Sequence, residues 1–192
     1  MATTGYSLIE VLFVLSTAAT VSAMAVPPFS AAIDEYRTAG AVRYVSTRIQ
    51  RTRMEAVSRS TNVAMYFVQA GSGFSFGVYI DGNGDGVRTA DIRNGIDRLL
   101  GTIERLSDNY AGVDFGLFPG LPPVDPGSPP PGSDPIKLGS STLLSYSSIG
   151  TSSAGSVYIR GRQVQYVIRI LGHTGRARVL KFDPRTSQWK AL

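Results

Sequence analysis

Glu10 is a carboxylate in surroundings that favour pairing with a cation. It is the single charge in an apolar stretch, and the 23 residues from Val11 to Ile33 carry no charge. A carboxylate beside hydrocarbon is costly unless it has a partner, so such groups usually have one. The nearest following cation is Arg37, beyond the apolar span. A cut after Gly5 would make Tyr6 a new amino terminus, and that ammonium on a neighbouring molecule could pair with Glu10.

A glycine- and aspartate-rich segment, residues 81–91, could bind a metal ion. Its oxygen ligands, followed by a glycine, match the first half of an EF-hand-type calcium loop: Asp81, Asn83, Asp85 and Gly86. The twelfth position is Ile92 rather than glutamate, so Asp91 or Asp97 would have to supply the last carboxylate. The same residues are typical of a hairpin loop that binds nothing. Calcium binding and plain turn chemistry are therefore both open.

The C-terminal part of the chain is basic, with eight Lys and Arg residues and one acid after residue 155. Gly175-Arg176-Ala177-Arg178 places two arginines two positions apart, and a strand would project both from one face. Together with nearby basic residues they could contact the phosphates of DNA, and the candidate set is Arg160, Arg162, Arg176, Arg178 and Lys181. The alternative is that these charges protect an exposed strand edge from aggregation.

Motifs of catalysis are missing from the sequence. There is one histidine, His173 in an expected turn, and there is no cysteine, Gly-x-Ser-x-Gly elbow or Walker loop. The spacing of Gly82, Gly84 and Gly86 is not a dinucleotide fingerprint, because no helical pattern follows it. We expect a protein that is not an enzyme.

A long N-terminal helix must position Glu10. At 1.5 Å per residue the uncharged span reaches about 34 Å, enough to cross a bilayer core, so residues 6–33 are expected to form a transmembrane helix. Pro27-Pro28 should bend or locally break it. Residues 34–61 are predicted to form an amphipathic helix, because apolar or weakly polar residues recur every three or four positions: Val42, Val45, Ile49, Thr52 and Ala56.

From Asn62 onward the pattern has period two, which predicts an antiparallel β domain over residues 62–192. The candidate strands are Val63–Val68, Phe74–Ile80, Leu99–Leu106, Val113–Phe118, Thr142–Tyr146, Ser156–Arg160, Val164–Leu171 and Arg176–Phe182. The last two should form a hairpin through Gly172–Gly175. Residues 118–135 contain eight prolines and should form an extended, exposed loop. The expected fold class is α+β, with the helix packed on the β domain.

The N-terminal residues resemble a known signal. Gly5, an aromatic residue, Ser7-Leu8-Ile9-Glu10-Val11-Leu12 and an apolar run are similar to the class III signal of type IV pilins and type II secretion pseudopilins. The resemblance implies a leader of residues 1–5, cleavage after Gly5 by a prepilin peptidase, methylation of Tyr6, and pairing of Glu10 with the amine of a neighbouring subunit. An ordinary secretory signal peptide is the alternative, since Ala23-Met24-Ala25 fits a small-x-small cleavage site.

The C-terminal half resembles the GspH/FimT group of minor pilins and pseudopilins, through Gly155-Ser156-Val157-Tyr158-Ile159-Arg160, Thr174-Gly175-Arg176-Ala177-Arg178-Val179 and the 81–86 loop. This implies a single-pass inner-membrane protein with a periplasmic domain, assembled with other pilin or pseudopilin subunits near a filament tip for protein secretion or pilus biogenesis. A DNA-binding minor pilin for DNA uptake is the alternative, because a terminal GRxR is associated with DNA capture in some FimT-like pilins.

Overall fold

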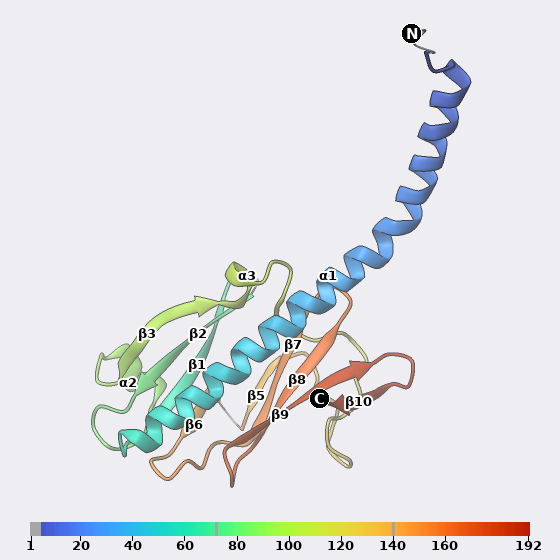
Figure 1. The fold of residues 1–192 in the computed structure, drawn as a ribbon. Helices are drawn as coiled ribbons and strands as arrows, with labels where there is room; N and C mark the ends of the chain where they lie inside the picture. The colour runs from blue at the N-terminus through green and yellow to red at the C-terminus, as the bar shows by residue number, and fades with distance from the viewer. Residues whose placement is uncertain (1–4, 72, 140) are drawn as a thin grey trace.

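One helix organises the structure. The computed structural model describes residues 5–71, 73–139 and 141–192, and of residues 25–28 it describes the backbone alone. Helix α1 (Leu8–Ser58) is 51 residues long. Its second half packs on the β domain, and its first half extends away from the domain (Figure 1). The expected leader, residues 1–5, lies outside the described residues except for Gly5. The α+β layout expected from the sequence is confirmed.

The proline pair does not interrupt α1. Residues 27 and 28 are helical, so the two segments expected at 6–33 and 34–61 form a single helix. Prolines lack the backbone N–H and crowd the preceding turn, which kinks a helix. In Figure 1 the helix changes direction between its exposed part and the part against the domain.

The second half of α1 packs on the domain through the expected stripe. Its five members are all buried, none more than 2% exposed: Val42, Val45, Ile49, Thr52 and Ala56. Residues three and four apart lie on one helix face, so the stripe forms one continuous contact. It meets strands of both β-sheets, and the shared core includes Phe67, Phe76 and Ile168.

The β domain contains two antiparallel sheets. The first has the order β3-β2-β1-β6 and is made of β1 (Val63–Ala70), β2 (Gly73–Ile80), β3 (Arg98–Arg105) and β6 (Leu143–Tyr146). The second has the order β10-β9-β8-β7-β4, with β5 also paired to β7. Its strands are β4 (Asp114–Phe115), β5 (Ile136–Leu138), β7 (Gly155–Arg160), β8 (Gln165–Leu171), β9 (Arg176–Asp183) and β10 (Gln188–Ala191). Two short helices, α2 (Thr89–Arg93) and α3 (Leu106–Asn109), complete the domain.

The sequence predicted the long strands and missed the short elements. The expected hairpin is present as β8 and β9, with Leu171 opposite Arg176. Strands β5 and β10 and helices α2 and α3 were not predicted. The expected strand 113–118 is only two residues long, because the buried side chain of Gln165 binds the chain that follows. It accepts from the Phe118 N–H at 3.0 Å and donates to the Gly116 carbonyl at 3.1 Å.

The proline-rich loop, residues 118–135, forms no helix or strand, and residues 126–130 are exposed as expected, but the loop is not exposed throughout. Val124 of the loop, and Leu117 just before it, pack on an apolar cluster formed by Tyr158, Val167 and Leu180, on the face of the second sheet away from α1. The indole of Trp189 donates to the Pro122 carbonyl at 3.0 Å. Burying apolar surface on this side favours a packed loop over a solvated one. The loop therefore covers part of the outer face of the sheet.

Candidate functional site

Glu10 lies in the first turn of α1, where it completes a capping box. Its Oε2 accepts from the Ser7 N–H at 2.9 Å, and its own N–H donates to Ser7 Oγ at 3.5 Å. This reciprocal pair satisfies two amide groups that a helix start leaves unpaired. Within the described chain, Glu10 Oε1 accepts no hydrogen bond and the carboxylate has no cationic partner. One oxygen of Glu10 thus remains free for a group from outside.

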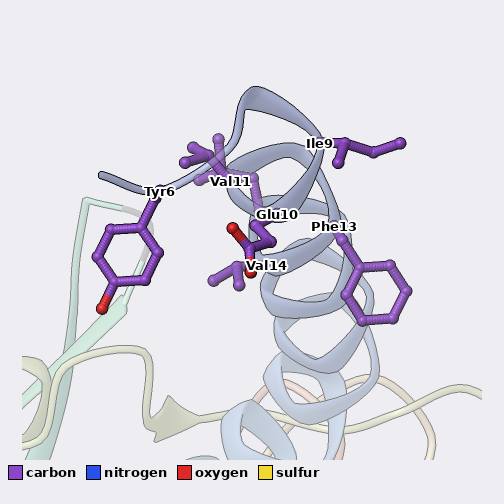
Figure 2. Close-up of a pocket in the computed structure, with 7 residues that line it drawn as sticks. Tyr6, Ile9, Glu10, Val11, Phe13 and Val14 are labelled. Atoms are coloured by element: carbon purple, nitrogen blue, oxygen red, sulfur yellow. The ribbon is translucent and has the colours of Figure 1, made fainter. Parts of the chain in front are cut away.

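The surface around Glu10 is apolar and open. An open hollow is lined by Tyr6, Ile9, Glu10, Val11, Phe13, Val14 and Leu15. In Figure 2 the carboxylate of Glu10 lies on the same side of the helix as Val14, while Ile9 and Phe13 lie on another side. Phe13 is 67% exposed and Ile9 is 75% exposed. Such a surface needs an apolar environment, and the carboxylate would be the one charge within it.

The exposed half of α1 is apolar enough to cross a membrane. Its most apolar window of 18 residues has a mean hydropathy of 1.9, and none of that window is buried by the rest of the described chain. Length and composition are the properties that support this.

A carboxylate that the sequence did not single out fixes the domain to the helix. Asp34 is one residue beyond the uncharged span and is 7% exposed. Its two oxygens accept from the Arg162 N–H at 2.9 Å and the Gln163 N–H at 2.8 Å. A Cβ on Gly161 would lie 2.2 Å from Thr38 Oγ1, so only glycine lets the β7–β8 loop approach this closely. Charge-assisted hydrogen bonds to buried amides are strong.

Arg176 and Arg178 lie together on the outer face of β9. Both are exposed, and among the described residues neither guanidinium has a hydrogen bond or an ion pair. Arg178 is directly opposite Arg169 of β8, so the three arginines share one face. Gly175, which precedes the two arginines, is required by the backbone at this position. Its φ is +61°, and a Cβ there would lie 2.3 Å from the Gly150 carbonyl.

The other basic candidates do not join this pair. Lys181 differs from Arg178 by an odd number of positions, so it points to the helix side, where it pairs with Glu35 of α1. Arg160 is opposite Gln165, at the far end of β8 from Leu171 and Arg176. Six residues of strand, about 20 Å, separate the two ends. The expected patch of five is therefore split among three places.

Two other arginines on the outer face of the second sheet already have partners within the chain. Arg169 forms an ion pair of 2.6 Å with Asp125 of the proline-rich loop and a hydrogen bond of 3.4 Å with Ser156. Arg160 lies over the ring of Phe118, with its guanidinium carbon 5.8 Å from the ring centroid. Of the arginines on this face, Arg176 and Arg178 are thus those with neither an ion pair nor an aromatic partner within the described chain.

The 81–91 loop uses its carboxylates to hold its own backbone. Asp81 Oδ1 accepts from the N–H groups of Asn83 (3.2 Å) and Gly84 (2.7 Å). Asp81 Oδ2 accepts from Gly86 N–H and from Asn62 Nδ2, both at 2.8 Å. Burial alone would raise the pKa of the Asp81 carboxyl, but these four donors outweigh it and the pKa lies below its ordinary value.

The remaining calcium candidates do not converge on Asp81. Asp97 accepts from the N–H groups of Gly82 and Arg88, and Asp85 pairs with the Arg88 side chain at 2.9 Å. Asp91 lies in α2. Among the described residues no three acidic or histidine side chains are grouped to hold a metal ion. The geometry favours turn chemistry, and calcium binding through Asp81, Asn83, Asp85 and Asp91 stays a prediction.

His173 is exposed in the β8–β9 turn, as its sequence position suggested. Comparisons of the chain with protein-family models, with curated proteins and with solved structures found no match.

Proposed function

We propose that this chain is a minor pilin or pseudopilin subunit of the GspH/FimT type, which supports protein secretion or pilus biogenesis. The observation that carries the proposal is the exposed half of α1, apolar on all sides with Glu10 as its one charge, extending from a folded domain. Before assembly a membrane would surround this half. In a filament, the helices of other subunits would replace the lipid.

The geometry of Glu10 suits a role in assembly. Cleavage after Gly5 would leave Ser7 preceded by Tyr6, so the Ser7 N–H remains an amide and the capping box can persist. Oε2 is then still occupied by Ser7, whereas Oε1 remains free for a cation. The ammonium of Tyr6 from a neighbouring subunit has the right charge and, at the start of its own helix, the right depth. A paired charge at that depth costs far less than an unpaired one.

The proposal includes the place of the protein in the cell. Residues 6–33 would span the inner membrane once, and the β domain would lie in the periplasm. The partners would be a prepilin peptidase and other pilin or pseudopilin subunits. No step of this function needs catalysis by the chain itself.

The processing step is tested by the intact mass and N-terminal sequence of the membrane-extracted protein. We expect a mature chain that begins at Tyr6 and carries one methyl group. The matched variant Gly5→Leu should retain the leader, while its domain folds as in the wild type. A mature chain that begins at Val26 would support a secretory signal peptide and overturn the proposal.

The assembly step is tested with Glu10→Gln in cells that produce the partner subunits. This variant keeps the shape of the side chain and removes its charge. We expect it to reach the membrane normally and to lose at least tenfold in co-purification with other subunits. The control is Glu55→Gln, which removes a surface pair with Arg59 on the packed half of α1 and should assemble normally. Normal assembly of Glu10→Gln would contradict the proposal.

A second candidate function is DNA binding for DNA uptake, favoured by the exposed and unpaired Arg176 and Arg178. Two guanidinium groups on one strand face could each contact a backbone phosphate. We expect the full chain in non-ionic detergent to bind duplex DNA with a marked salt dependence, and Arg176→Ala with Arg178→Ala to lose most of the binding. Arg93→Ala with Arg98→Ala, two exposed arginines elsewhere, is the control. Equal binding by both double variants would exclude the β9 site.

A further inference from the structure

The end of the domain where α1 leaves it lies next to the apolar span. Asp34 follows that span directly, and the β7–β8 loop is fixed to Asp34 by two backbone hydrogen bonds. Tyr110, after α3, lies against Gly40 one to two turns further along the helix. We call this end the neck, comprising residues 34–37, 107–113 and 160–163. If residues 11–33 lie in a bilayer, the neck is at the level of the phospholipid headgroups, a layer about 5 to 7 Å thick on each side.

The exposed side chains of the neck are those that favour a membrane interface. Tyr36 is 80% exposed, and Arg37, Arg160 and Arg162 are exposed as well. Tyrosine and arginine near the end of a membrane helix act as interface anchors, because each combines an apolar body with a polar end. None of these four side chains forms an ion pair with another described residue.

The acids of the neck do not cancel this charge at the surface. Asp34 is buried and its oxygens accept from backbone amides. Glu35 pairs with Lys181. Asp114, one residue beyond the neck, is half-buried beside Gly73 and accepts from the Phe115 N–H, and burial raises the pKa of its carboxyl. Asp108 of α3 is exposed, and among the described residues it has no ion pair.

Arg160 and Arg162 also form the walls of an open groove. It is lined by Arg160 and Arg162 together with Ser107, Asp114 and Phe118. The loop backbone that carries Arg162 is held by Asp34, and the Arg160 guanidinium is held over Phe118. Guanidinium groups bind phosphate oxygens in a bidentate manner, and fixing them beforehand lowers the cost of binding.

We propose that the neck is a binding surface for phospholipid headgroups, with Arg160 and Arg162 contacting the phosphate and Tyr36 and Arg37 placed in the interface. The inference depends on the proposed membrane insertion of α1. It assigns Arg160 and Arg162 to the membrane rather than to a nucleic acid. The contact would hold the domain down against the membrane before assembly and would have to be released when the subunit leaves the bilayer.

The test uses the full chain reconstituted into vesicles of phosphatidylcholine alone or with phosphatidylglycerol. The chain has no cysteine, so a single fluorophore can be attached at Ser107→Cys in the groove or at Ile149→Cys, which is 80% exposed at the opposite end of the domain. Quenching by lipids that carry a spin label at the headgroup reports the distance to the interface. We expect quenching at position 107, stronger with the anionic lipid, and little at position 149.

The matched variants decide which residues are responsible. Arg160→Gln with Arg162→Gln should weaken headgroup binding about fivefold for each arginine, about 25-fold together, and the quenching at position 107 should fall with it. Arg160→Lys with Arg162→Lys should retain most of it, and Arg93→Gln with Arg98→Gln should leave it unchanged. Unchanged Trp189 fluorescence would establish that each variant is folded. Unchanged quenching in the Arg160→Gln, Arg162→Gln variant would overturn the proposal.

Two further experiments show which part of the proposal has failed if the expected quenching is not seen. Inorganic phosphate added to anionic vesicles should not reduce the quenching if headgroups are the ligand, and competition by it would point to a site for free phosphate instead. Extraction of the vesicles with alkaline carbonate tests insertion of α1 separately. Release of the protein would overturn the membrane proposal and this inference together. Retention without quenching at position 107 would overturn this inference alone.

Discussion

The two halves of α1 are both rich in apolar residues, and the structure buries them in different ways. Every side chain from Leu8 to Met24 is exposed. In the half from Asp34 to Ser58, one stripe is buried and the other faces carry arginines and glutamates. The first half needs apolar surroundings on all sides, whereas the second needs one partner surface, which its own domain supplies. A bilayer or a bundle of other helices can provide the apolar surroundings that the first half needs.

This difference separates two kinds of mutational effect. Substitutions in the packed half should change the stability of the domain, because its contacts are within the chain. Substitutions in the exposed half should change insertion or assembly and leave the domain stable. The free energy of unfolding of the full chain in non-ionic detergent, followed through the single Trp189 that packs against Tyr158 and Phe182, measures the first kind alone.

The largest difference in the free energy of unfolding should be between two isoleucine substitutions, one in each half of α1. Ile49 is 1% exposed and Ile9 is 75% exposed. Ile49→Ala should lower the free energy of unfolding by about 3 to 4 kcal/mol, since it removes buried methyl groups and leaves a cavity. Ile9→Ala should change it by less than about 0.5 kcal/mol. Equal losses in urea titrations of the two variants would mean that the exposed half also packs on the domain.

Asp34 should give the next largest effect. Asp34→Ala leaves the amides of Arg162 and Gln163 without acceptors, so we expect a loss of about 2 to 3 kcal/mol. Asp34→Asn keeps one oxygen acceptor and should lose less. Glu10→Ala removes an acceptor at the other end of the uncharged span and should leave the same urea midpoint unchanged. An unchanged midpoint for Asp34→Ala would refute its role as the anchor of the packed half.

Asp81 tests the far end of the packed half, because it binds Asn62 just beyond the end of α1. Asp81→Asn replaces one acceptor by a donor and should cost about 1 to 2 kcal/mol at neutral pH. The native pKa of Asp81 is below its ordinary value of 3.8, so this contribution is complete above that value and is lost as pH falls through the native pKa. The difference between wild type and Asp81→Asn should therefore be constant from neutral pH to about pH 5 and should shrink below about pH 4.

Helical and strand periodicities explain what the sequence could predict. The stripe from Val42 to Ala56 and the β8–β9 hairpin depend on residues close in sequence, and both are present. The role of Asp34 could not be predicted, because the amides that it binds lie 128 and 129 positions away. Strand β5 is three residues long, too short for its alternation to be distinguished from chance.

The five basic candidates were wrongly expected to form one patch, and part of this error was avoidable. Lys181 is three positions from Arg178, so period two already puts it on the other face of any strand that contains both. The separation of Arg160 from Arg176 depends on the register of β7, β8 and β9, which local patterns do not determine. The packing of Leu117 and Val124 on the outer face was hidden by the surrounding prolines, which suggest exposure.

The smallest effect should come from the ion pair between Glu35 and Lys181, which joins the first turn of the packed half to β9. Both side chains are partly solvated, so Glu35→Gln should cost about 0.5 kcal/mol at neutral pH and low salt, and nearly nothing at about 1 M salt. The hydrogen bond to Glu35 raises the pKa of Lys181 above its ordinary value of 10.5. The contribution of the pair is therefore complete below that value and is lost as pH rises through the native pKa. Urea titrations of wild type and Glu35→Gln should converge in this alkaline range, and Lys181→Gln should behave like Glu35→Gln. A salt-sensitive loss as large as that of Asp34→Ala would mean that the pair anchors the helix as strongly as the buried Asp34 does. Surface charge would then contribute as much as the buried carboxylate to fixing the packed half of α1 to the domain.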